Sequence, residues 1–156
     1  LASRPENGFG YRGSFSMPLK LSLKPGERFV LNGAVVQNGE KRSTLVLQNK
    51  ASVLREKDIM HAEEVTTPAR RIYFPVMMMY LSEKQDDALY NEFVVRMTDF
   101  MGAISDTEAM AECVSVSRDV MAGEFYKALI RCRKLIEFED KRLSSVGTGL
   151  PNSSDA

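Results

Sequence analysis

The sequence is poor in the residue types that enzymes and metal proteins rely on. It has one histidine, His61, and two cysteines, Cys113 and Cys132, which form no CxxC pair. A single histidine excludes a multi-histidine metal site and a histidine triad, and the cysteine spacing suggests neither a zinc site nor a disulfide scaffold. We interpret both cysteines as reduced, buried thiols and expect no metal and no cofactor.

Other signatures of catalysis and of membrane insertion are also absent. No GxxxxGK[ST] motif and no dinucleotide-binding glycine pattern occurs, and the carboxylate pairs at 63–64 and 86–87 fall at polar segment boundaries, where solvated or capping roles are common. No apolar run reaches the ~20 residues of a membrane helix, and the first residues do not resemble a signal peptide. We therefore expect a cytoplasmic protein that is not an enzyme and does not bind membranes.

The formal net charge is zero, so binding to nucleic acid would have to use a local basic patch. Such a patch is possible because the charge is uneven. Residues 17–81 hold ten Lys or Arg against six Asp or Glu, whereas residues 82–143 hold nine against thirteen. The first part is basic and the second is acidic.

Patterned sequence begins near Met17, so we interpret residues 1–16 as a flexible extension and residues 144–156 as a disordered tail. Leu19, Leu21 and Leu23 alternate with polar residues, which is the period of a half-buried strand. Asn32-Gly33 then marks a two-residue hairpin between strands at 28–31 and 34–37. Further strands are predicted at 44–48, 51–55 and 72–81, the last bulged or at a sheet edge because of Pro75.

Helical periodicity follows, with apolar stripes over 89–104, 110–121 and 125–136. The predicted fold class is therefore α+β. A β-rich domain at 17–81, a small antiparallel sheet or barrel, is followed by a three-helix bundle at 82–143.

Basic residues gather at the strand ends and turns of the predicted β-rich domain. Each is explained singly by solvation, but together they could line one groove that contacts the phosphates of single-stranded RNA. The candidate RNA-binding residues are Lys20, Lys24, Lys41, Arg42, Lys50, Arg55 and Lys57.

Two further groups are candidates for binding a protein partner. Met77, Met78 and Met79 could form an adaptable surface, although core packing is the simpler interpretation. Lys127, Arg131 and Lys134 follow helical spacing and would form one basic ridge, which an ordinary solvated face also explains.

The sequence of residues 19–139 resembles the FlbT family of flagellum biosynthesis regulators. The resemblance lies in LSLKPGERFVLNGAVVQNG (21–39), LQNKASVLREKDIM (47–60), TPARRIYFPVMMMYL (67–81) and YKALIRCRKLIEFE (126–139). It implies a cytoplasmic bacterial regulator of flagellin synthesis that acts on the 5′ untranslated region of flagellin messenger RNA. The sign of regulation stays open, because both repression and activation are associated with the family.

A second resemblance links LKLSLKPGE (19–27) and ASVLREKDI (51–59) to the CsrA family of RNA-binding translational regulators. It implies that two edge strands line the RNA site and that Arg55 contacts RNA, so we expect Arg55 to be exposed at a strand edge. Leu23 and Leu54 stand where that family usually has an arginine and a histidine. Lys20, Lys24 and Lys57 would then have to supply contacts instead.

Two functions are therefore expected from the sequence. The first is a post-transcriptional regulator that binds the flagellin mRNA leader. The alternative is a protein-interaction module or flagellin-directed chaperone acting through the helical half, with flagellin or FlaF as partner. Spare apolar area on the helices could also form a homodimer interface.

Overall fold

The computed structural model describes residues 18–82 and 84–148. The predicted extension at 1–16 and the last part of the predicted tail, 149–156, lie outside the described residues. The chain divides into two compact units, one ending at Glu56 and one beginning at Lys57. The boundary thus falls after Glu56 rather than after Leu81 as predicted.

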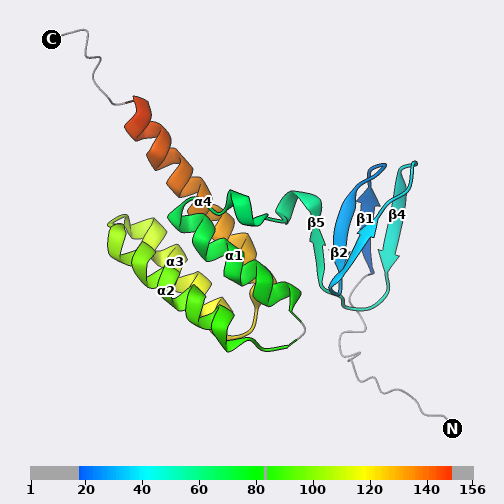
Figure 1. Ribbon diagram of the computed structural model, residues 1–156, viewed down its shortest axis with the longest axis horizontal. Helices are drawn as coiled ribbons and strands as arrows, with labels where there is room; N and C mark the ends of the chain where they lie inside the picture. The colour runs from blue at the N-terminus through cyan, green and yellow to red at the C-terminus, as the bar shows by residue number, and fades with distance from the viewer. Residues whose placement is uncertain (1–17, 83, 149–156) are drawn as a thin grey trace. The chain divides into compact units, whose positions relative to one another are not determined.

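The first unit, called the β unit, is built from five short strands (Figure 1). Strand β1 (Leu19–Leu23) pairs antiparallel with β4 (Ser43–Leu47). Strand β2 (Arg28–Leu31) lies between β3 (Ala34–Gln37) and β5 (Val53–Arg55), antiparallel to both. The small antiparallel β-structure predicted from the sequence is confirmed, although its strands form two sheets.

Local sequence explains the hairpin of this unit. Asn32 and Gly33 join β2 to β3 with φ of 49° and 83°, the positive values that a two-residue hairpin of this kind requires. The two sheets enclose a core formed by Leu21, Leu23 and Phe29. Leu54 of β5 is also fully buried.

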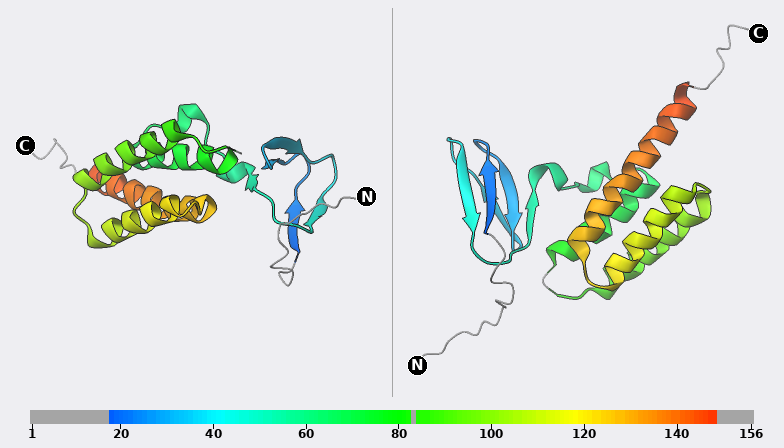
Figure 2. Two further views of the ribbon diagram at one scale, coloured as in Figure 1. Left: turned by 90° about the horizontal axis from the view of Figure 1, so that it is seen from below. Right: turned by 180° about the vertical axis from the view of Figure 1, so that it is seen from behind.

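The second unit, called the helical unit, contains four helices: α1 (Pro68–Leu81), α2 (Asp87–Ala103), α3 (Thr107–Met121) and α4 (Phe125–Thr148). Two short 3-10 helices, Glu56–Asp58 and Ala62–Glu64, precede α1. α1 packs against α2 and α4, and α3 packs against α4, as two further views show (Figure 2). The α+β class is confirmed, with four helices in place of the predicted three.

The strand predicted at 72–81 is wrong, because these residues belong to α1. Thr67 caps the helix by accepting a hydrogen bond from the Arg70 amide, and Pro68 occupies the first turn, where proline is favoured. Pro75 lies inside the helix, where a proline removes one backbone hydrogen bond and its ring crowds a carbonyl one turn earlier.

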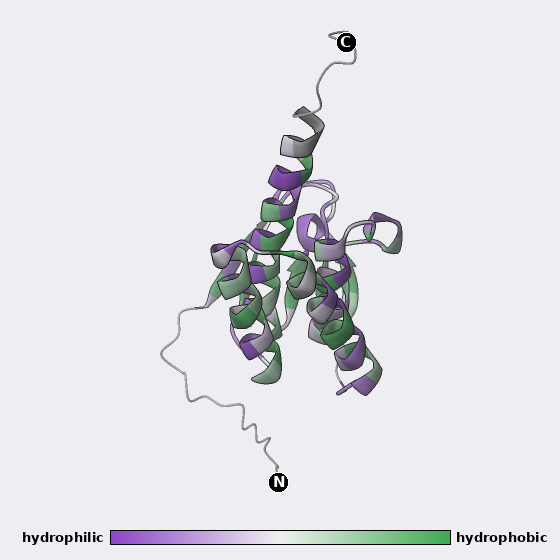
Figure 3. Cartoon of the chain, turned by 90° about the vertical axis from the view of Figure 1, so that its left-hand side faces the viewer, coloured by the Kyte–Doolittle hydropathy of each residue, from purple (hydrophilic) through white to green (hydrophobic). Residues whose placement is uncertain are grey.

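The tail predicted from Ser144 is also corrected, because α4 continues to Thr148. Extending a formed helix by one residue needs no new nucleation, so polar residues can continue the helix. Hydrophobic and hydrophilic residues alternate along the helices (Figure 3), as amphipathic packing requires. The buried face of α4 includes Leu129, Cys132 and Leu135.

Candidate nucleic-acid interface

The outward face of the β1–β4 sheet is mostly polar and basic, although the exposed apolar residue Val46 lies there opposite Lys20. Side chains alternate along a strand, so Leu21 and Leu23 point into the core while Lys20 and Ser22 are exposed. The register places Ser22 opposite Thr44 of β4. Lys24 follows β1 and is exposed as well.

Arg42 extends this face from the segment that leads into β4. Its Nη1 donates to the hydroxyl of Ser22 at 3.4 Å, which is at the long limit for a hydrogen bond. Arg42 is exposed, and within residues 18–82 and 84–148 no carboxylate forms an ion pair with it. Its guanidinium is therefore only weakly held by its own chain.

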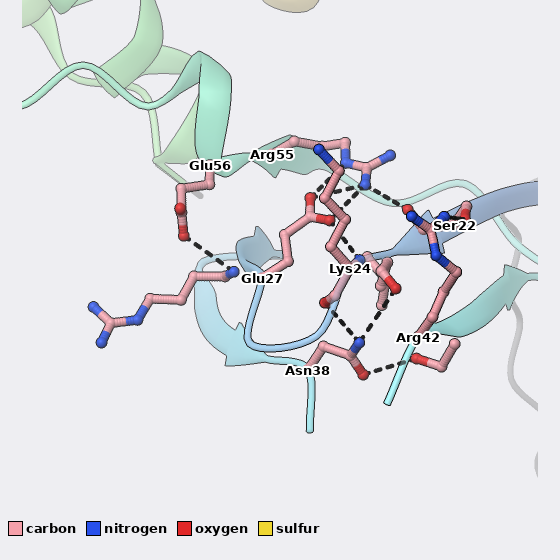
Figure 4. A network of polar contacts seen from close by, with 10 residues as sticks. Ser22, Lys24, Glu27, Asn38, Arg42, Arg55 and Glu56 are labelled. Carbon is pink, nitrogen blue, oxygen red and sulfur yellow. Dashed lines mark hydrogen bonds and ion pairs between the residues drawn. The ribbon is translucent and has the colours of Figure 1, made fainter. Parts of the chain in front are cut away.

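Arg55 is engaged far more tightly. Its Nε and Nη2 donate to the Glu27 carboxylate at distances between 2.8 and 3.0 Å, and Nη2 also donates to the carbonyl of Ser22 at 2.6 Å (Figure 4). Since β5 and β1 belong to different sheets, this side chain fastens one sheet to the other. We call the Arg55–Glu27–Ser22 contact the clasp.

Electrostatics favour the ionised clasp. The backbone amide of Lys24 donates to Glu27 Oε1 at 3.0 Å. This hydrogen bond, followed by those from Arg55, holds the pKa of Glu27 below its ordinary value, because each stabilises the charged carboxylate. Glu27 therefore stays negative at neutral pH and orients the guanidinium.

The sequence placed Arg55 at a strand edge and predicted that it is exposed. The edge position is confirmed, since β5 is the outer strand of the order β3-β2-β5. The exposure is corrected: the side chain is 29% exposed and pairs with a carboxylate of its own chain. A contact between Arg55 and RNA stays a prediction.

The other predicted RNA-binding residues are exposed but not all are gathered together. Lys20 and Lys24 share the β1 face beside Arg42, whereas Lys41 and Lys50 lie on the connections before and after β4. Lys57 is exposed and opens the helical unit.

Asn38 is a site residue that sequence reasoning missed. Its Nδ2 donates to the carbonyls of Lys24 at 2.8 Å and Lys41 at 3.0 Å, and its Oδ1 accepts from the Ser43 hydroxyl at 2.7 Å. This side chain ties the end of β1 to the turn that carries Arg42. An Asn-Gly dipeptide such as Asn38-Gly39 indicates a turn, but nothing local shows which carbonyls the side chain binds.

The candidate partner-binding residues of the helical unit differ in their surroundings. Met77 and Met79 are buried, while Met78 is 37% exposed. Lys127 and Lys134 are exposed. Arg131 is half-buried and pairs with Asp119 and Glu112 of α3, so it stabilises the bundle rather than forming an open ridge with the two lysines.

A cavity of about 260 Å³ also lies in the helical unit, lined by residues that include Asp58, Tyr73 and Arg133. Two of its polar side chains contact Asp58: Arg133 pairs with the Asp58 carboxylate, and the Tyr73 hydroxyl donates to the carbonyl of Asp58 at 2.8 Å. In the described part of the chain, no group of three or more His, Cys, Asp or Glu side chains could hold a metal ion. Nor is any described helix long and apolar enough to cross a membrane.

Comparison with known proteins gives one consistent answer. The family model described as "Flagellar protein FlbT" matches residues 19–143. The "Flagellum biosynthesis repressor protein FlbT" of Caulobacter vibrioides (strain ATCC 19089 / CIP 103742 / CB 15) is 61% identical over 140 residues, covering 90% of this chain and 99% of its own length.

Other relatives carry the name "Probable flagellum biosynthesis repressor protein FlbT". The protein from Caulobacter sp. (strain K31) is 65% identical over 130 residues, covering 83% of this chain and 99% of its own. The protein from Rhodopseudomonas palustris (strain TIE-1) is 38% identical over 132 residues, covering 82% and 99%. No solved structure matches.

Proposed function

We propose that this chain, which belongs to the FlbT family of flagellar proteins, regulates flagellin synthesis by binding the 5′ untranslated region of flagellin mRNA in the cytoplasm. The relatives' names describe a repressor of flagellum biosynthesis, not an enzyme. One observation carries the RNA part of the proposal. Lys20, Lys24 and Arg42 are exposed together on the outward face of a sheet.

Physical chemistry connects this face to RNA. The chain as a whole is neutral, so an anionic polymer must be attracted by a local excess of positive charge. Contacts to phosphates supply affinity, and each contact made to single-stranded RNA adds about −0.7 to the slope of log affinity against log salt concentration. The side chains of Ser22 and Thr44 add hydroxyl groups that can donate to phosphate oxygens.

The test is a binding titration of the purified protein with a labelled flagellin leader RNA at several salt concentrations. A scrambled RNA of equal length and composition serves as the control. We expect tighter binding of the leader, and a clear loss of affinity when Lys20, Lys24 and Arg42 are all replaced by glutamine. Equal affinity for leader and scrambled RNA, or no binding of either, would reject the proposal.

A second candidate function has its own observation. The helical unit exposes several large apolar side chains, and a protein partner bound over them would remove them from water. They are Tyr90, Val94, Val95, Val114, Met121, Tyr126 and Ile130. A protein-interaction module or chaperone would use this surface to bind flagellin or FlaF, or to form a homodimer.

The two candidate functions can be distinguished because one requires the β unit and the other requires the helical unit. Replacing Val94 and Val114 with serine should abolish a pull-down of flagellin if the helical unit acts as a chaperone, and should leave leader RNA binding unchanged. The glutamine triple variant of the β unit should show the opposite pattern.

A further inference from the structure

Two guanidinium groups converge on Ser22 from different parts of the β unit. Arg55 of β5 donates to its backbone carbonyl at 2.6 Å, and Arg42, just before β4, donates to its hydroxyl at 3.4 Å (Figure 4). Glu27 is the carboxylate that pairs with Arg55. The positive charge around the hydroxyl is therefore only partly neutralised.

Donor capacity remains at this position. The hydrogen bonds of Arg55 use Nε and Nη2, and among the described residues its Nη1 has no hydrogen-bond partner. Arg42 uses Nη1 for one long contact to a neutral oxygen, whereas a guanidinium offers five N–H donors. The Ser22 hydroxyl can donate in addition to accepting.

The fold holds the Arg55 side chain and the backbone that leads to Arg42 in place, which lowers the cost of binding. The clasp fixes Arg55, and Asn38 fixes the turn that leads to Arg42 through its bonds to the carbonyls of Lys24 and Lys41. Because these supports are made without a ligand, less conformational freedom is lost when an anion binds.

We propose that the Ser22 hydroxyl, the Arg42 guanidinium and Nη1 of Arg55 form a site for one phosphate group. Arginine forks match the geometry of phosphate oxygens, and a hydroxyl donor completes the set. Where the phosphate belongs to the leader RNA, the inference rests on the proposed function. A free phosphate or phosphate monoester has the same chemistry and is the other source.

The first experiment measures leader RNA affinity of the wild type, Arg42→Gln and Arg28→Gln. Arg28 is the matched control because it is an exposed arginine in the same unit but on β2, and its backbone bond to Glu56 survives the change. Arg42→Gln should lose about tenfold in affinity and about 0.7 of the salt slope. Arg28→Gln should change affinity by about twofold or less.

The second experiment needs no RNA. Inorganic phosphate is titrated into the full chain while backbone amide signals are followed by NMR. The Ser22 amide should shift saturably in the wild type and in Arg28→Gln, but not in Arg42→Gln. Arg42→Lys keeps the charge and loses the fork, so it should bind phosphate more weakly than the wild type. Unchanged far-UV circular dichroism checks that each variant is folded.

The outcomes distinguish the two levels of the proposal. Saturable phosphate binding at Ser22 without leader binding would support the site, reject RNA as its source and reject the proposed function. Leader binding that Arg42→Gln and Arg28→Gln weaken equally, with no phosphate shift at Ser22, would overturn the site while the function stands. Absence of both leader and phosphate binding would overturn both.

Discussion

The β unit and the helical unit are stabilised by different means. In the β unit a small core around Phe29 is supplemented by the charged clasp of Arg55 and Glu27. In the helical unit most stabilisation comes from apolar packing between helices, with side chains such as Ile72 and Leu129 completely buried. The smaller unit therefore depends on a few contacts, whereas the larger unit distributes its stability over many.

This difference fits the proposed division of roles. A small sheet with an outward basic face can present charges without burying them, because its core needs only one side of each strand. The helical unit instead pairs its inward charges, as Arg131 does with Asp119. The helical unit also exposes cations, such as Lys127 and Lys134, so the β unit is distinguished by the gathering of basic side chains on one face of a sheet.

If the β unit depends on a few contacts, Phe29→Ala should cause the largest loss of stability among the variants considered. The side chain is 1% exposed, and such truncations cost about 3–5 kcal/mol. A unit of about forty residues has little stability in reserve, so the β unit should unfold. NMR should show loss of β-unit amide dispersion while ellipticity at 222 nm largely remains.

Two further variants serve as controls for Phe29→Ala. Val35→Ala, at a side chain that is 75% exposed, should leave the β unit folded. Leu129→Ala should cost about 2–5 kcal/mol and yet leave the helical unit folded at 25 °C, because more contacts remain. A Phe29→Ala protein with intact β-unit dispersion would show that the clasp, not the core, dominates.

The sequence predicted much of the β unit because its signals are local. Alternation at Leu19, Leu21 and Leu23 and the Asn32-Gly33 dipeptide located the strands to within a few residues. The pairing of β1 with β4 was not predicted, since no local pattern encodes a contact across the intervening hairpin.

The error at 68–81 has a specific cause. An apolar run covered on both faces suits a strand or a buried helix equally, and Pro75 was interpreted as a bulge or an edge position of a strand. The buried residues Ala69, Ile72 and Val76 follow three- and four-residue spacing, which with Thr67 as N-cap was the available signal for a helix. Because most residues of α1 are apolar and many are buried, the sequence shows no polar face that would reveal the helical spacing.

Candidate site residues could be located by type but not by partner. Lys20, Lys24 and Arg42 were identified because basic residues at strand ends are visible in the text. The pairing of Arg55 with Glu27 spans 28 positions, and it depends on which strands meet. A charge that forms an internal ion pair looks the same in sequence as one that is free.

A smaller loss of β-unit stability is expected when the pH is lowered. Because the folded state lowers the pKa of Glu27 from the ordinary 4.5, the unfolded state binds the proton more readily. The stabilisation by the clasp is therefore complete above pH 4.5 and is lost as pH falls through the lowered pKa. Urea midpoints of the β-unit amides should therefore fall as the pH is lowered below 4.5.

Glu27→Gln should destabilise the β unit at pH 7 and remove part of this acid dependence. The matched control is Glu40→Gln, since Glu40 is exposed and forms no ion pair within the described residues. Identical acid profiles for Glu27→Gln and the wild type would show that the clasp contributes nothing through its charge.

The smallest effect should appear in the helical unit at high pH. Burial raises the pKa of the Cys113 thiol from 9.0 to about 11 and also raises the pKa values of Cys132 and Tyr73. The folded state thus resists deprotonation, so stability is complete below pH 9 and declines as pH approaches 11. For Cys113 alone, the free energy of unfolding should fall by about 1 kcal/mol at pH 10.

Urea midpoints at pH 7, 9 and 10 measure this decline in stability, and Cys113→Ala should make the decline smaller. A decline of equal size in a variant with both cysteines replaced by alanine would assign the alkaline loss to groups other than the thiols.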